Sequence, residues 1–261
     1  MKEQLLKIVK IGGNVINDEI ALSSFLKGFA AIGGPKILVH GGGKKATEVS
    51  SAVGLQPQMI NGRRVTDAAT VEVVTMVYAG LLNKKVVAQL QQFNCNALGL
   101  SGADANCILA HKREVKDVDY GFAGDVDSIN VEFINVLLQN NVTPVFCAIT
   151  HDKKGQLLNT NADTIVSEIA IGMSKLYDTE LNFVFELKGV LKSIEDKNSV
   201  ITHINPEKYK ELTEAGIIAD GMFPKMHNCF NALEKGVGKV KIGDASLVQS
   251  DTKLYTTLSL K

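Results

Sequence analysis

The sequence carries no excess of charge of either sign. Its 28 lysines and arginines are matched by 28 aspartates and glutamates, giving a formal net charge of +0 and a pI near 7.0. A neutral chain gives no electrostatic reason to expect binding to nucleic acid or to an anionic membrane surface. Any phosphate group that this chain binds must therefore be recognised by individually placed lysines and backbone N–H groups.

Clustered cysteines, long apolar runs and an export signal are also missing. The four cysteines are scattered and form no C-x-x-C pair, so we expect reduced thiols rather than disulfides or a zinc site. No apolar run approaches the ~20 residues that a membrane span needs. The first residues lack the apolar segment and cleavage site of a signal peptide. We expect a cytoplasmic protein with no membrane partner.

What the chain does contain is an alternation of short β-branched runs and longer helical patterns. This alternation predicts βαβ units and a mostly parallel sheet, in one large domain or two lobes that share the sheet. The predicted strands are residues 6–11, 36–40, 97–100, 142–149, 182–187 and 239–242. The predicted helices are residues 18–32, 44–53, 67–93, 131–140, 163–173, 206–215 and 224–235. Two polar stretches, 111–127 and 194–199, are expected to be hairpins or loops.

The predicted helix at 67–93 is long and apolar on more than one face. Asp67 stands at the position of an N-cap, and Val71, Val74 and Tyr78 recur at helical spacing. This pattern is typical of a buried core helix. A helix shared across a dimer interface would show the same pattern.

Two glycine-rich turns follow predicted strands. In Lys10-Ile11-Gly12-Gly13 a lysine ends an apolar strand, and the glycines allow a close backbone approach to an anion. His40-Gly41-Gly42-Gly43 leads into a helix whose first N–H groups could bind an anion. A tight turn without a ligand is the plain alternative for each. Gly41, Gly43 and Ala46 also match a dinucleotide fingerprint, but the acidic residue that should follow about 20 positions later is missing, as is a Walker A Lys-Ser/Thr pair.

Three further segments carry polar residues next to predicted helices. Arg64 could grip a carboxylate in bidentate fashion, whereas Arg63 is the better candidate for a surface arginine paired with Asp67. Asn159, Asn161 and Asp163 crowd one helix start, which is more than capping requires.

Lys225 follows Pro224 in the first turn of another predicted helix. A cation there opposes the helix dipole, and a bound phosphate would reverse that small penalty. The plain alternative is a solvated lysine.

Taken in order, these segments resemble the acetylglutamate kinase branch of the amino-acid kinase family. The resemblance spans nearly the whole chain and rests on Lys10-Ile11-Gly12-Gly13, His40-Gly41-Gly42-Gly43, Asn61-Gly62-Arg63-Arg64-Val65-Thr66, Gly99-Leu100-Ser101-Gly102, Gly121-Phe122-Ala123-Gly124-Asp125-Val126, Asn159-Thr160-Asn161-Ala162-Asp163 and Asp220-Gly221-Met222-Phe223-Pro224-Lys225. The Asn-Gly-x-Arg-Val-Thr and Asn-x-Asn-Ala-Asp pieces separate this branch from carbamate, aspartate and uridylate kinases.

The resemblance implies an α/β fold, an αβα sandwich around a mostly parallel open sheet, and a set of site residues. The N-terminal lobe, about residues 1–175, would bind the acyl amino acid, and the C-terminal lobe, about 176–261, would bind ATP. By analogy, Lys10 and Lys225 reach the transferring phosphoryl group and Asp163 orients both lysines. The glycines Gly12, Gly13, Gly42 and Gly43 would supply backbone donors around the phosphates and the acceptor. Arg64 and Asn159 would hold the α-carboxylate of the substrate. The nucleotide would lie against Leu187, Gly189, Leu191, Ile217, Ile218 and Ala219.

The implied reaction moves the γ-phosphoryl group of ATP to the side-chain carboxylate of N-acetyl-L-glutamate, an early step of arginine biosynthesis. A carboxylate is already nucleophilic at neutral pH, so alignment and charge neutralisation suffice. Mg²⁺ would be held by the nucleotide phosphates and water, with no protein ligand.

The sequence departs from the family pattern in two places. Where the family shows Asp-Val-x-Gly-Val, this chain has Glu186 in place of the aspartate, preceded by Phe185 in place of a small hydroxyl residue. The chain also begins almost directly at its first strand, whereas arginine-inhibited members carry an extra N-terminal helix that links dimers into hexamers. We therefore expect a homodimer without arginine feedback.

Three alternatives remain open at this point. The acceptor could be N-succinyl-L-glutamate, because the sequence offers no rule for the acyl pocket. The chain could be a kinase-fold sensor without catalysis, although retention of Lys10, Asp163 and Lys225 argues against this. A nicotinamide-dependent dehydrogenase, suggested by Gly41-x-Gly43, is the weakest of the three.

Overall fold

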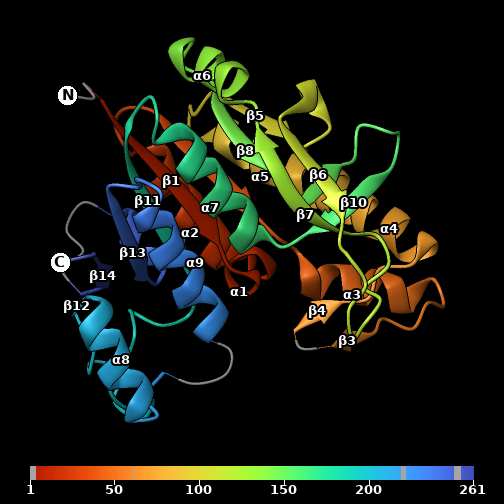
Figure 1. The fold of residues 1–261 in the computed structure, drawn as a ribbon. Helices are drawn as coiled ribbons and strands as arrows, with labels where there is room; N and C mark the ends of the chain where they lie inside the picture. The colour runs from red at the N-terminus through yellow and green to blue at the C-terminus, as the bar shows by residue number, and fades with distance from the viewer. Residues whose placement is uncertain (1–3, 61, 219–221, 250–253) are drawn as a thin grey trace.

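The computed structural model describes residues 4–60, 62–218, 222–249 and 254–261, except for the side chain of Pro224. Its centre is an eight-stranded sheet in the order β12-β14-β13-β11-β1-β2-β8-β5 (Figure 1). All neighbouring pairs are parallel except β13 and β14. The bounds of these strands are β1 Leu5–Ile11, β2 Lys36–His40, β5 Ala97–Leu100, β8 Thr143–Phe146, β11 Asp178–Val184, β12 His203–Ile204, β13 Lys239–Gly243 and β14 Thr256–Leu258.

Helices cover both faces of this sheet, which confirms the predicted sandwich. One face carries α6 (Val131–Gln139), α7 (Ala162–Met173) and α9 (Phe223–Glu234), which pack on β8, on β1, β2 and β11, and on β13. The other face carries α2 (Glu19–Ala30) and α5 (Asn83–Gln92), with α1 (Gly13–Asn17) and α3 (Gly43–Ala52) beside them. Helix α8 (Pro206–Glu214) lies near β12.

Side-chain caps start most of the predicted helices. Asp18 accepts a hydrogen bond from the N–H of Ala21 at 2.9 Å, and Asp67 accepts one from Thr70 at 2.7 Å. Asn130 and Asn205 do the same for α6 and α8. Each satisfies an N–H group that has no acceptor inside its helix, and the predicted starts at residues 18, 67, 131 and 206 lie within one residue of the observed ones.

The long predicted helix is one continuous stretch with a π-helical middle. It comprises α4 (Ala68–Thr75), the π-helical segment η1 (Met76–Leu82) and α5. Its inner side is core, since Val74, Leu82 and Val86 are buried. Met76 and Leu81 point outward, with 60% and 50% of their surface exposed.

Two strand predictions were wrong in extent. The predicted strand 142–149 breaks after Phe146, because the chain leaves the main sheet there and re-pairs in a second one as β9 (Ile149–His151). The predicted strand 182–187 lies within β11 only as far as Val184, where pairing with β1 ends, although the N–H of Phe185 still donates to Gly243 of β13. The hairpin expected at 111–127 is confirmed by antiparallel pairing of β6 (Ile108–Lys112) with β7 (Ala123–Ile129).

The second sheet was not predicted. It is a small closed barrel formed by β6, β7, β9 and β10 (Leu157–Thr160), and a short hairpin of β3 (Met59–Ile60) and β4 (Arg63–Arg64) lies nearby. The two are linked where Thr66 and Gly121 form an isolated bridge. In the part of the chain that the structure describes, no helix is long and apolar enough to cross a membrane.

Gly121 is required by the close approach at this bridge. Its φ is +64°, and a Cβ there would lie 2.2 Å from the carbonyl oxygen of Thr66. Gly216 has a similar φ of +69° with open space around it. We expect Gly216→Ala to lower the free energy of unfolding by about 1 kcal/mol through backbone strain alone. Gly121→Ala should lose about 1–3 kcal/mol more because the backbone must move. Urea unfolding of both variants measures the difference, and equal losses would contradict the clash.

A buried histidine joins the end of β2 to the long helix. His40 has no exposed surface; its Nδ1 is 2.8 Å from the carbonyl oxygen of Gly41, and its Nε2 is 3.1 Å from Nδ2 of Asn83. A neutral ring with the proton on Nδ1 satisfies both contacts, because Nε2 then accepts from the Asn83 amide. Burial lowers the pKa of His40 from 6.5 to about 4.

This pKa makes stability depend on pH. Between pH 7 and pH 5 the unfolded chain takes up a proton at His40 that the folded protein excludes, so stability falls as the pH falls. His40 accounts for about 2 kcal/mol of the fall in the free energy of unfolding between pH 7 and pH 5. We expect the unfolding free energy of His40→Gln to depend less on pH than that of the wild type. His203→Gln, at an exposed position, is the control; a His40→Gln profile parallel to the wild type would overturn the assignment.

Candidate active site

Two of the three predicted catalytic residues, Lys10 and Asp163, meet where the parallel strands end. Lys10 is the second-last residue of β1, paired in register with Val39 of β2 and Phe183 of β11. Its Nζ lies 2.8 Å from Oδ1 of Asp163, which stands in the first turn of α7. Both side chains are 15% exposed. Ligands of open α/β sheets bind at this carboxyl edge of the strands.

The three polar residues at the start of α7, Asn159, Asn161 and Asp163, make different contacts. Asn161 is the cap, since its Oδ1 accepts from the N–H groups of Asp163 and Thr164 at 2.7 and 3.2 Å. Asp163 is thereby left to pair with Lys10. Asn159 donates through Nδ2 to Oγ1 of Thr66 at 3.0 Å and lines a neighbouring cavity.

That cavity encloses about 200 Å³ between the glycine turn after β2 and the small barrel. Its lining includes Arg64 and Asn159, and its other residues are Gly41, Gly42, Gly43, Met59, Gly62, Arg63, Tyr78, Arg113, Ala123, Gly124, Ala148, Thr160, Asn161 and Ala162. Ala162, which lines the cavity, directly precedes Asp163 in α7, so the cavity lies one residue along the chain from the ion pair. The structure thus brings the two predicted substrate-binding side chains together beside the catalytic pair.

Arg64 is held firmly with part of its guanidinium unused. It is 7% exposed, and its Nη2 donates to the carbonyl of Gly43 at 2.9 Å and to Oγ1 of Thr47 at 2.7 Å. Its Nη1 is buried and makes no hydrogen bond of good geometry to a described residue, and the guanidinium interacts with the Tyr78 hydroxyl, whose pKa is raised by burial and lowered by Arg64. A buried donor without a good hydrogen bond is costly, so a carboxylate acceptor in the cavity would be strongly stabilised there.

Arg113 also lines the cavity, but its charge is already balanced. Its guanidinium grips Asp125 through Nε, at 3.0 and 3.2 Å from the two carboxylate oxygens, and through Nη2. This contact lowers the pKa of Asp125 and raises that of Arg113. This ion pair connects the end of β6 to β7 beside the cavity. Arg63 is exposed and makes no ion pair with Asp67 or any other described residue, contrary to the role expected for it.

The glycine turns differ from the prediction in one respect. The N–H of Gly12 donates to the carbonyl of Val184 at 2.8 Å, so it extends the β1–β11 ladder and is not free for a ligand. Gly13 starts α1, where the first N–H groups have no helical acceptor. A Cβ on Gly42 would lie 2.3 Å from Cδ1 of Leu82, so the turn needs glycine to pass close to η1.

Lys225 lies in the first turn of α9, as predicted, but Asp163 is not its partner. Its Nζ is 5.1 Å from the centroid of the Phe185 ring. The charges of Asp163 and Lys225 both act on Cys229, which is fully buried one turn further along α9. Burial raises the pKa of this thiol, and Asp163 raises it further while Lys225 lowers it. The expectation that Asp163 orients both lysines therefore holds in direct contacts for Lys10 alone.

The residues predicted to contact the nucleotide are only partly accessible. Gly189, Leu191 and Ile218 are buried, whereas Leu187 is half-buried and Ile217 is 37% exposed. Ala219 lies outside the described residues. In the described ranges no group of three or more histidines, cysteines, aspartates or glutamates could hold a metal ion.

Sequence reasoning missed the residues that orient the site. Thr66 holds Asn159 and Thr47 holds Arg64. A signal existed for Thr47, because it lies four residues after Gly43 and so faces the same side of α3. No local pattern links Thr66 to Asn159, which is 93 residues away.

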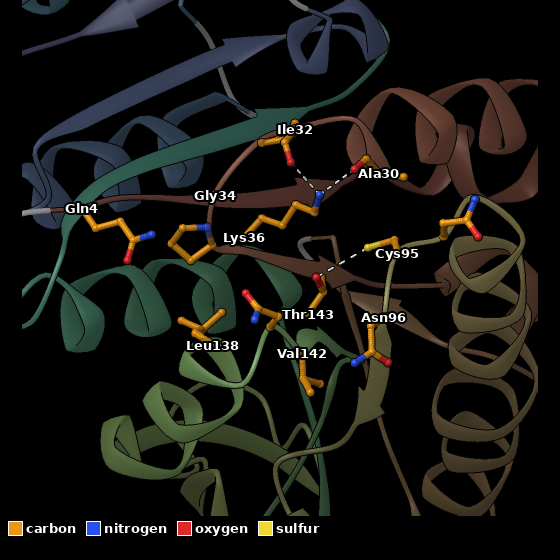
Figure 2. A pocket seen from close by; sticks show the side chains of 13 residues that line it. Gln4, Ala30, Ile32, Gly34, Lys36, Cys95, Asn96, Leu138, Val142 and Thr143 are labelled. Carbon is orange, nitrogen blue, oxygen red and sulfur yellow. Dashed lines mark hydrogen bonds between the residues drawn. The ribbon is translucent and has the colours of Figure 1, made fainter.

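A larger cavity of about 440 Å³ lies at the opposite edge of the sheet (Figure 2). Its residues precede or begin the strands, as Pro35, Asn96 and Thr143 do. Figure 2 shows the amino group of the buried Lys36 turned to the carbonyls of Ala30 and Ile32, each at 2.7 Å. This lysine closes the end of α2, so its donors serve the fold.

Comparison with known proteins agrees with this geometry. The model of the amino acid kinase family matches residues 6–244. Proteins named acetylglutamate kinase are similar over almost their full length: one from Cytophaga hutchinsonii is 52% identical over 94% of both chains, and one from Bacteroides fragilis is 47% identical over 96% of both.

Solved structures show the same fold. The crystal structure of smu.665 from Streptococcus mutans has a TM-score of 0.81 at 26% identity over the whole of both chains. Carbamate kinase from Giardia lamblia has a TM-score of 0.70 at 14% identity, with both chains fully covered. The chain belongs to the amino acid kinase family.

Proposed function

We propose that this protein transfers the γ-phosphoryl group of ATP to the side-chain carboxylate of N-acetyl-L-glutamate, giving N-acetylglutamyl 5-phosphate for arginine biosynthesis. The observation that carries the proposal is the buried Nη1 of Arg64, which makes no hydrogen bond of good geometry to a described residue, in a cavity one residue along the chain from the Lys10–Asp163 pair. An acylated glutamate has two carboxylates. Arg64 would hold one, and the other would reach the ion pair.

Each residue then has a defined task in the transfer. The acceptor carboxylate is ionised at neutral pH, so no general base is needed. Lys10 neutralises charge on the phosphoryl oxygens, and Asp163 fixes the direction of its ammonium. Lys225 approaches from α9. The acceptor lies in the lobe of about residues 1–175 and ATP in the lobe of about 176–261, so transfer crosses between β1 and β11.

Mg²⁺ fits this site as a companion of the nucleotide. Asp163 is the carboxylate at the transfer point, and it is paired with Lys10. Mg²⁺ keeps several waters and is commonly held by substrate phosphates. Bound in that way, it would neutralise further charge on the phosphate oxygens.

The relatives named above support the choice of acceptor, because proteins named acetylglutamate kinase match this chain almost end to end. N-succinyl-L-glutamate is the second candidate. The observation in its favour is that Arg63, exposed and without an ion-pair partner, lines the same cavity as Arg64. Its guanidinium could meet the additional carboxylate of a succinyl group.

The test is ATP-dependent acyl-phosphate formation, trapped with hydroxylamine, on both acylglutamates in parallel. We expect turnover by the wild type and a loss of about 10²–10³-fold in kcat for Lys10→Ala and for Lys225→Ala, since each removes a charge from the transition state. Lys208→Ala, which breaks only a surface ion pair with Glu211, should keep wild-type kcat. The preferred substrate identifies the acyl group. ATP binding without turnover on either substrate would instead indicate a sensor.

We further propose that two copies associate through the long helix. Met76 and Leu81 are exposed on η1, and an apolar hollow of about 530 Å³ lies beside Met76, lined in part by Val71, Phe122 and Leu157. A second copy of the same helix would cover these residues.

Sedimentation velocity tests this association. We expect a dimer for the wild type and a monomer for the double variant Met76→Glu, Leu81→Glu, because two carboxylates would be buried without partners. Ile194→Glu, at an 83% exposed position in the 194–199 loop, should remain dimeric. A monomeric wild type at micromolar concentration would end the proposal.

A further inference from the structure

Phe185 contacts both the turn that follows Lys10 and the ammonium group of Lys225. It follows the last residue of β11, and its N–H donates to the carbonyl of Gly243 at 2.9 Å. A Cβ on Gly12 would lie 3.6 Å from Cα of Phe185, so Phe185 packs directly against the turn that follows Lys10. On its other side the ring faces Nζ of Lys225.

The ring is the contact that the structure gives to Lys225. Among the described residues the lysine forms no ion pair and no hydrogen bond, and the 5.1 Å distance from Nζ to the ring centroid lies within the range of a cation–π contact. The first turn of a helix repels a cation. An attractive partner is therefore needed to keep this ammonium at the end of the strands when no phosphate is present.

An aromatic ring and a carboxylate hold a lysine with different consequences. Asp163 carries a full negative charge, so it orients Lys10 but also offsets its charge. The face of a ring attracts an ammonium through its quadrupole and carries no net charge. Lys225 thus keeps its whole positive charge for an incoming phosphate.

We infer that Phe185 is a positioning residue for phosphoryl transfer, which fixes Lys225 beside the Lys10–Asp163 pair through the face of its ring without neutralising it. This inference rests on the proposed kinase function and assigns to Phe185 a role in how the γ-phosphate is met. It predicts that replacing the ring lowers kcat and weakens binding of ATP more than binding of ADP. The KM for the acylglutamate should stay unchanged, because the acceptor cavity does not include Phe185.

The first test compares Phe185→Leu with Phe185→Tyr in the full chain. The leucine keeps an apolar side chain without a π face, and we expect kcat to fall about 2- to 30-fold, while the tyrosine should restore most of the activity. Tyr255→Leu is the matched control, because it removes a similar ring, 5.0 Å from Nζ of Lys241, outside the site. Its kcat should equal that of the wild type. Urea midpoints confirm that each variant is folded.

The second test separates the ring's electrostatics from its packing. Phenylalanines carrying one, two and three fluorines, incorporated at position 185, weaken the quadrupole stepwise with little change of shape. We expect log kcat to fall stepwise with fluorine number. A kcat independent of fluorination, or a Phe185→Leu variant as active as the wild type, would overturn the inference.

A binding measurement keeps this test independent of the acceptor. Calorimetric titration with Mg²⁺-ATP and Mg²⁺-ADP needs no acylglutamate, and the ratio of the two affinities should shift toward ADP along the fluorine series. Absence of turnover in the wild type with this shift present would refute the proposed acceptor and leave the role of Phe185 standing. Turnover in the wild type, with a ratio of ATP to ADP affinity that does not change along the fluorine series, would support the proposed acceptor and refute the role of Phe185.

Discussion

The ion pair between Lys10 and Asp163 is the contact on which the site depends. It joins the end of a central strand to the first turn of a helix on one face of the sheet, at 2.8 Å and with both side chains mostly buried. Removing two charges from water is expensive, and the cost is offset only by good geometry and further contacts. Two features favour the pair: Asp163 stands in the first turn of α7, where the helix dipole stabilises a carboxylate, and Asn161 caps the helix so that Asp163 is not needed there.

Around this pair the fold brings two unlike sheets together. The parallel sheet supplies the glycine turns at its carboxyl edge, and the small barrel supplies Asn159 and the wall that carries Arg113. The chain passes from the parallel sheet to the barrel between Phe146 and Ile149, and Ala148 in this connection lines the cavity. A cavity with polar residues on both walls results, and neither sheet could form it alone.

Local signals in the sequence predicted the elements well and their long-range assembly poorly. Asp67 marked a helix start correctly because capping is a short-range interaction. The resemblance to the family brought Lys10, Arg64 and Asp163 together, which no periodicity could have done. The barrel, the early end of β11 and the use of the Gly12 N–H within the ladder depend on pairing between distant segments. Such pairing leaves no mark in either partner read alone.

The unequal partners of the two lysines set the charge of the candidate site. Lys10 and Asp163 together are neutral, whereas Lys225 beside a ring and Arg64 among backbone and hydroxyl acceptors each retain a positive charge. In the proposed site Lys225 therefore stands where the phosphate should arrive, and Arg64 with Arg63 where a carboxylate should bind. Lys10 differs from Lys225 and Arg64, because the charge of Asp163 offsets its own. A chain of zero net charge can in this way concentrate positive potential at one edge of its sheet.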